Sequence, residues 1–136
     1  MPARRIAVAI GVLLSLSACA SLQDAKCKSS ERLAVQDTLY FGTKKPNGVV
    51  TREEWARFLE AIVTPRFPQG LTVSEAEGQW RGGDGSLVGE STHVLHLVHP
   101  DDGPNEKFVT EIISSYKAQF EQEAVLRVKA SACVSF

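Results

Sequence analysis

The sequence predicts an α+β domain whose elements follow the order β-α-β-β-α-β. Three observations lead to this prediction: four segments alternate or run apolar as strands do, two segments repeat apolar residues at helical spacing, and breaker-rich stretches separate them. The chain has 136 residues, of which 43% are hydrophobic and 23% charged, and 15 basic residues nearly balance 16 acidic ones. This composition is typical of one globular domain, and the lack of a basic excess argues against nucleic-acid binding.

The first strand and the first helix are predicted between residues 35 and 65. Val35–Thr43 turns apolar toward its end and is followed by the breaker Lys44–Gly48, which indicates a strand ending in a turn. Thr51 and Glu54 have the spacing of a capping box at a helix N-terminus. Pro65 ends that helix. Its apolar face consists of Trp55, Phe58, Leu59, Ile62 and Val63.

A hairpin of two strands follows, over residues 71–81 and 87–99, joined by the glycine-rich loop 82–86. The first of these strands alternates polar residues with small or apolar ones, so one packed face is expected. The polar set is Glu75, Glu77, Gln79 and Arg81, and the other set is Ser74, Ala76, Gly78 and Trp80.

The second helix is predicted after the break at residues 100–104, and a closing strand over residues 124–136. The helix has one apolar stripe, formed by Phe108, Val109, Ile112, Ile113, Tyr116 and Phe120. In the closing strand, Leu126 and Val128 alternate with Arg127 and Lys129. These charges, like those of residues 71–81, suit an edge strand.

Right-handed crossovers fold this order into a ferredoxin-like, four-stranded antiparallel sheet with both helices on one face. The first and third strands are then central, and residues 94–98 are apolar on both faces, as a central strand requires. The face without helices must be covered by a second copy of the sheet or by a ligand. We expect a sheet-to-sheet homodimer, with a shared pocket as one possible consequence.

The N-terminal 18 residues have the features of a signal peptide. Arg4 and Arg5 precede the apolar run Ile6–Ala18, whose 13 residues are fewer than the about 20 that a membrane-spanning helix needs. Residues 16–19, Leu-Ser-Ala-Cys, resemble the lipobox of bacterial lipoproteins, which implies lipid attachment at Cys19. The alternative is a secreted protein cut at a nearby alanine.

The leader divides the chain into a signal peptide (residues 1–18), a lipidated cysteine with a polar tether (19–34) and one domain (35–136). Ala20 follows the cysteine, and by the same resemblance this favours a location in the bacterial cell envelope, at the outer membrane facing the periplasm. Loss of Arg4 and Arg5 with the leader would leave 13 basic residues against 16 acidic ones.

Cys27 and Cys133 are predicted to form a disulfide, because that compartment is oxidising. The bridge would close a loop of about a hundred residues, with a stabilisation of at most about 4.7 kcal/mol. Two free thiols are the alternative. Neither cysteine has a further ligand at zinc-site spacing, so no metal and no cofactor are expected.

A candidate ligand-binding group lies at the end of the first hairpin strand. Gln79, Trp80 and Arg81 offer an amide, an indole and a guanidinium, and Glu90 is expected across the hairpin at a position to pair with Arg81. The alternative is a plain hairpin salt bridge with Trp80 in the core. Tyr40 is a further candidate. His93, His96 and His99 do not form a metal cluster, because alternate faces of a strand separate them.

Several stretches together resemble a family of small bacterial secreted and lipid-anchored proteins, catalogued as domain of unknown function 3574. They are Leu39–Gly42, Thr64–Thr72, Gly78–Arg81, Glu90, Tyr116, Phe120–Val125 and Cys133. The resemblance extends over the domain from Val35 onward and implies no particular activity.

Two functions fit these observations. The first is a non-enzymatic binding or interaction module of the envelope that contacts a small ligand or an envelope protein through Gln79, Trp80, Arg81 and Glu90. The second is a small cofactor-free enzyme, isomerase or oxygenase-like, with a pocket on the open sheet face of a dimer that contains Tyr40, His96 or Glu90. No Gly-x-Ser-x-Gly or P-loop pattern favours another enzyme class.

Overall fold

The computed structural model describes residues 27–136. The predicted signal peptide, the lipid attachment at Cys19 and residues 20–26 of the tether lie outside the described residues. The elements are β1 (Arg32–Gly42), β2 (Lys44–Lys45), β3 (Gly48–Val49), α1 (Arg52–Phe58), the π-helical turn η1 (Leu59–Val63), β4 (Thr72–Arg81), β5 (Leu87–His99), α2 (Gly103–Phe120) and β6 (Leu126–Val134).

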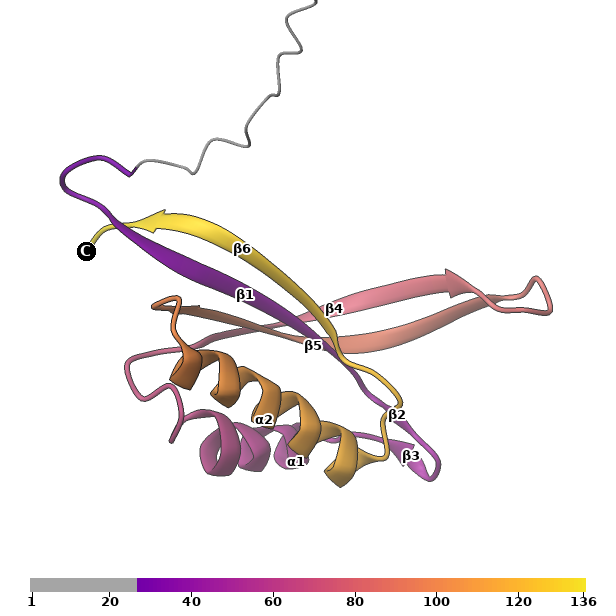
Figure 1. Cartoon of the computed structure of the whole chain (residues 1–136). Helices are drawn as coiled ribbons and strands as arrows, with labels where there is room; N and C mark the ends of the chain where they lie inside the picture. Colours follow the sequence, from indigo (N-terminus) through magenta and orange to yellow (C-terminus); the bar gives the residue numbers. More distant parts are fainter. Residues whose placement is uncertain (1–26) are drawn as a thin grey trace, which may run out of the picture.

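The main sheet has the strand order β4-β5-β1-β6, and every neighbouring pair is antiparallel. Both helices lie against one face of this sheet, and the other face has no helix on it (Figure 1). β1 and β5 are the central strands, and β4 and β6 are the edges. The predicted ferredoxin-like α+β fold, with its order of central and edge strands, is therefore confirmed.

The segment between β1 and α1 is more structured than a simple turn. Lys44–Lys45 pairs with Gly48–Val49 to form the short hairpin β2–β3. α1 then begins at the predicted capping box, in which the Glu54 N–H donates to Thr51 Oγ1 and the Thr51 N–H donates to Glu54 Oε2. The reciprocal cap fixes where the helix starts, directly after the hairpin.

The core lies between the helices and the inner face of the sheet. Its centre is aromatic: the rings of Phe41 and Tyr116 lie 4.6 Å apart, and the Tyr116 hydroxyl donates a hydrogen bond to the carbonyl of Gly42. Burial raises the pKa of Tyr116, so this hydroxyl stays a donor. The fully buried members of the core include Leu39, Phe41, Val63, Leu95, Leu97, Val109, Ile112 and Tyr116.

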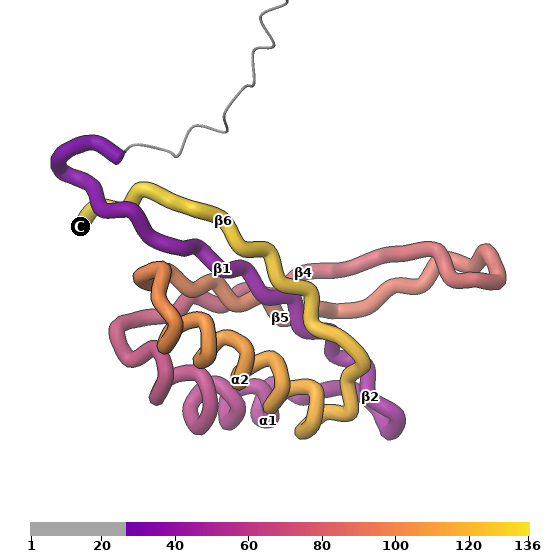
Figure 2. Tube along the Cα trace, in the orientation of Figure 1, coloured from indigo at the N-terminus to yellow at the C-terminus, as the bar shows by residue number. Residues whose placement is uncertain are grey.

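The β4–β5 hairpin extends beyond the helices as an arm (Figure 2). Every residue of β4 is exposed except Gly78, which is half-buried. The expected packed face of β4 is therefore wrong, and Trp80, with 47% of its surface exposed, is not a core residue. The physical reason is that the helices of the described chain stop short of the outer part of the arm, and an open compartment separates the start of β4 from α1.

The sheet face without helices has mixed burial. Val94 at its centre is buried, while Tyr40, Val98, Leu126 and Val128 remain exposed. The sheet-to-sheet homodimer, in which a second copy would cover this face, stays a prediction. Within residues 27–136, no helix combines the length and apolar character needed to cross a bilayer.

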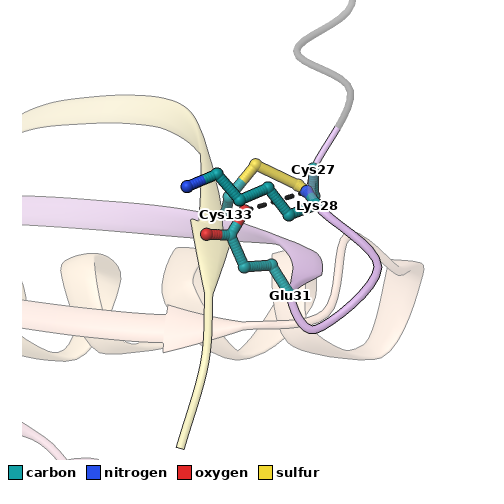
Figure 3. The surroundings of a disulfide bond; sticks show 4 residues. All are labelled: Cys27, Lys28, Glu31 and Cys133. Carbon is teal, nitrogen blue, oxygen red and sulfur yellow. Dashed lines mark hydrogen bonds between the residues drawn. A yellow bond between two sulfur atoms is a disulfide. The ribbon is translucent and has the colours of Figure 1, made fainter.

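The predicted disulfide between Cys27 and Cys133 is present, with an Sγ–Sγ distance of 2.12 Å (Figure 3). It joins the segment before β1 to the end of β6. The turn between Cys27 and β1 is closed by the Lys28 N–H, which donates to Glu31 Oε2 at 3.0 Å. The start of the described chain is thus covalently fixed to the edge of the sheet.

Candidate functional site

A cleft of about 540 Å³ lies where the arm leaves the body of the domain. The β2–β3 hairpin and the start of α1 form one side, and the inner edge of β4–β5 forms the other. Most of its lining residues carry polar side chains, and the full set is Thr43, Lys44, Val49, Val50, Thr51, Arg52, Glu75, Glu77, Gly89, Glu90, Ser91, Thr92 and His93.

His93 is the least exposed titratable side chain of the cleft, with 7% of its surface exposed. Its ring stacks on Trp55 at 4.6 Å with an interplanar angle of 5°. Its Nε2 is buried and has no hydrogen-bond partner among residues 27–136. Burial lowers the pKa of His93 from its ordinary 6.5, and the charge of Glu75 opposes part of this effect. At neutral pH the ring is therefore an uncharged base.

Two carboxylates of β4 lie beside this imidazole. The sheet register places Glu75 opposite His93 and Glu77 opposite Ser91. Ser91 Oγ donates to Glu77 Oε1 at 2.8 Å, and Arg52 at the start of α1 lies 3.8 Å from Glu75. Because both partners of the Arg52–Glu75 pair are well exposed, that pair is easily opened.

Glu90 also lines the cleft, but its carboxylate lies against Gly42 on the sheet face opposite to His93, where Lys44 holds it. The Lys44 backbone N–H donates to Glu90 Oε1 at 2.6 Å, while Lys44 Nζ donates to the Gly89 carbonyl and lies 5.9 Å from the Trp80 ring. A Cβ at Gly42 would lie 3.0 Å from the same carboxylate oxygen, so glycine there leaves room for Glu90. The sequence indicated Glu90 and Trp80, and Lys44 is the residue that links them.

The structure separates the other predicted site residues from the cleft. Arg81 does not pair with Glu90, because the register sets Glu90 opposite Gly78. Arg81 Nη1 donates instead to the Gly85 carbonyl of the arm tip. Gln79 and Arg81 therefore lie toward the exposed end of the arm, and Tyr40 lies on the open sheet face.

The other two histidines have separate environments, as predicted from alternation. His96 Nδ1 contacts the Thr38 hydroxyl at 3.2 Å on the open face. His99 lies on the helix side with its Nε2 2.9 Å from Asp37 Oδ2. Among the described residues, the one set of three potential metal ligands is Cys27, Glu31 and Cys133, whose sulfur atoms are bonded to each other.

Sequence reasoning missed His93, Lys44, Arg52, Glu75 and Glu77 as site residues. Glu75 and Glu77 look like solvated edge charges in the sequence, and only pairing with β5 brings them to His93. The sequence contains one signal for this site, the lysine pair 44–45 between β1 and the helix cap. From the sequence alone, this pair is interpreted as part of a breaker.

The comparisons with known proteins place the chain in a family. A family model described as "Protein of unknown function (DUF3574)" matches residues 36–136. The chain belongs to this family. The match confirms the resemblance found in the sequence of this DUF3574 protein, and it extends from within β1 through the other five elements of the β-α-β-β-α-β core. The comparison with curated proteins finds no match.

Solved structures provide the second comparison. This DUF3574 protein is similar to a phage SAM lyase in complex with S-methyl-5′-thioadenosine, with a TM-score of 0.53, 12% identity and coverage of 85% of this chain and 97% of that one. The apo state of a phage SAM lyase gives a TM-score of 0.50 and 13% identity, over 82% and 94% of the two chains. At such identities the similarity concerns the fold.

These similarities overturn the first functional expectation. The binding or interaction module was preferred because no catalytic pattern stood out in the sequence, yet the fold that this DUF3574 protein shares over most of its length is that of an enzyme. The group of Gln79, Trp80, Arg81 and Glu90, on which the module depended, is also not assembled as one contact. The enzymatic alternative is better supported.

Proposed function

We propose that this protein is a small cofactor-free enzyme of the lyase or isomerase class, and that its reaction takes place in the cleft beside His93. The observation that carries the proposal is the position of His93, which lines a cleft beside two carboxylates and whose buried Nε2 has no hydrogen-bond partner among residues 27–136. A buried polar atom without a partner is costly, so a ligand that supplies the partner is the simplest reason for it. The fold of a lyase of similar length supports the same class.

The imidazole of His93 suits the removal of a proton from carbon. It is uncharged at neutral pH, because burial lowers its pKa, and a base that titrates close to the working pH is efficient. The C–H bond breaks, the proton goes to the imidazole, and the electron pair forms a double bond. In a lyase the leaving group departs with its bonding pair, whereas in an isomerase the proton returns to another carbon.

The charged groups around His93 would bind and orient the substrate. Glu75 and Glu77, on the same sheet face as His93, attract a positively charged substrate, and Glu90 adds negative charge at the rim of the cleft. Glu90 is held by the Lys44 N–H, so its carboxylate is fixed before a ligand arrives. The substrate class we propose is therefore a small cation, of which the sulfonium compound SAM is the first to test.

The expectations about location belong to the same proposal. The lipobox-like residues 16–19 support an enzyme held at the outer membrane by lipid on Cys19, facing the periplasm. The Cys27–Cys133 disulfide suits that oxidising compartment. Mass spectrometry of the N-terminal peptide tests the anchor: a diacylated Cys19 supports it, and an unmodified terminus at another residue contradicts it.

A homodimer through the open sheet face also remains part of the proposal. It is supported by the exposed apolar side chains of Tyr40, Val98 and Val128 on that face. Analytical ultracentrifugation should give a dimer that Val128→Arg dissociates. A wild-type monomer at micromolar concentration would contradict this part.

The activity is tested with the full chain, with SAM as substrate and release of S-methyl-5′-thioadenosine as the readout, together with deuterium uptake into SAM from D₂O. His93→Gln should lower the rate about 100-fold or more, as expected when a general base is lost. The matched control is His96→Gln on the open face, which should change the rate less than about threefold. Absence of both release and deuterium uptake, or equal losses in the two variants, would contradict the proposal.

A further inference from the structure

We infer that the cleft is one compartment of a two-part binding groove, and that the second compartment holds a flat apolar group attached to the cationic centre of the substrate. This inference rests on the proposed function for the identity of the reacting compartment. It adds a specificity site and narrows the substrate class to an organic cation that carries a ring.

The second compartment lies between α1 and β4 and has a volume of about 410 Å³. Its lining is largely apolar and consists of Arg52, Trp55, Ala56, Leu59, Val73, Ser74 and Glu75. Arg52 and Glu75 also line the cleft. The two compartments therefore adjoin along this pair.

A pair of stacked rings separates the compartments in the interior. Trp55 lines the second compartment and His93 lines the cleft, and the two parallel rings lie 4.6 Å apart. At the surface the divider is the ion pair between Arg52 and Glu75, whose charged atoms are 3.8 Å apart. An exposed pair of this kind contributes about 0–1 kcal/mol, so a ligand that spans both compartments can displace it at little cost.

The two compartments differ in chemistry. The cleft offers the carboxylates of Glu75 and Glu77 and the rim residue Glu90, and the ammonium of Lys44, which also lines it, donates to the Gly89 carbonyl. The second compartment offers the half-exposed side chain of Val73 beside the largely buried Trp55.

A ligand that carries both a cationic group and an aromatic ring would occupy both compartments. Its charge faces the carboxylates, and its ring covers apolar surface that is otherwise in contact with water. A bare small cation would use only the cleft, and an aromatic anion would be repelled by it.

The test measures the binding of three probes to the full chain carrying Trp80→Phe, so that Trp55 is its only tryptophan. The probes are benzyltrimethylammonium, tetramethylammonium and benzoate. Benzyltrimethylammonium should bind at least about tenfold more tightly than either of the others. It should also change the fluorescence of Trp55, whereas tetramethylammonium should not.

A matched pair of variants locates the ring. Val73→Asn makes one wall of the second compartment polar and should bring the affinity ratio of benzyltrimethylammonium to tetramethylammonium close to one. Leu87→Asn makes a similar change at an exposed leucine near the tip of the arm that lines neither compartment, and it should leave the ratio unchanged. A ratio near one in the starting protein, equal effects of both variants, or tight benzoate binding would overturn the inference.

These measurements do not depend on turnover. If the probes bind as expected but SAM is neither cleaved nor exchanged, the proposed reaction is wrong and the two-part groove stands. If SAM reacts but Val73→Asn leaves the probe ratio unchanged, the second compartment is wrong and the proposed reaction stands.

Discussion

Arg127 of β6 binds Asp37 of β1 through two hydrogen bonds, Nε to Oδ1 at 2.7 Å and Nη2 to Oδ2 at 2.8 Å. Asp37 is fully buried, and its Oδ2 also lies 2.9 Å from His99 Nε2. The guanidinium bridges onward to Glu106 at the start of α2. A charge buried in the central strand is thus connected to an edge strand and a helix by one arginine.

We expect Arg127→Met to destabilise the protein by about 3 kcal/mol, because removing one partner leaves the other charge buried and uncompensated. Chemical denaturation followed by circular dichroism measures this. Lys129→Met is the control, since Lys129 makes only exposed ion pairs with Asp101 and Glu106, and it should cost less than about 1 kcal/mol. Equal effects of the two substitutions would show that Asp37 does not need Arg127.

Stability should fall as the pH is lowered from 4.5 toward 2. The side-chain hydrogen bonds from Arg127 and then Lys129 lower the pKa of Glu106 from 4.5 to about 2. The folded state therefore binds fewer protons than the unfolded state in this window, and the stabilisation present above pH 4.5 is lost below it. Thermal unfolding between pH 7 and pH 2 should show a shallower acid slope in Glu106→Gln than in the wild type, and parallel curves would contradict the assignment.

The pH profile of the proposed reaction should report His93. Because burial lowers the pKa of His93, the rising limb of kcat/KM against pH should have its midpoint below 6.5. Glu75→Gln removes the charge that raises this pKa, so the midpoint should move further toward acid. A midpoint that stays fixed in Glu75→Gln would exclude His93 as the titrating base.

Loss of the disulfide should destabilise the domain without removing its fold. The bridge connects residues that are 106 positions apart, and the loss of such a long-range bridge typically costs about 2–5 kcal/mol. Unfolding of Cys27→Ser, compared with the wild type under non-reducing conditions, measures the effect. Cys19→Ser keeps the bridge and is the control. The same loss in both variants would contradict a specific role for the bridge.

Much of the fold was predictable because local patterns agree with one another. The capping box of Thr51 and Glu54 and the helical spacing from Trp55 to Val63 specify one helix, which the structure contains as α1 continued by the π-helical turn η1. The apolar run Val94–Val98 specifies the central strand β5. The crossover rule then left one arrangement of four strands. The prediction that Trp80 lies on a packed face was wrong, because the alternation of polar and apolar residues shows which side chains share a face of a strand. It does not show whether another layer covers that face.

The candidate site was predictable only in part. The sequence identified Glu90 but predicted an ion pair with Arg81. That pairing was wrong because the register of a hairpin with a five-residue loop cannot be read from composition. His93 was weighed with His96 and His99 as a metal ligand and set aside, and no pattern in the sequence singled it out as a base. Its stacking on Trp55, which lies 38 positions earlier in the chain, depends on how α1 packs on β5.

The sequence by itself determined the element order, the central and edge strands, the family and the cysteine pair, because each of these follows from local periodicity or from residue types at fixed positions. Only the tertiary structure decided that Lys44, Glu75 and His93 surround one cleft, and that Arg127 neutralises Asp37. Those relationships depend on strand register and on helix packing. A shift of one residue in register would turn Glu75 away from His93 without altering the local pattern that predicts the strand.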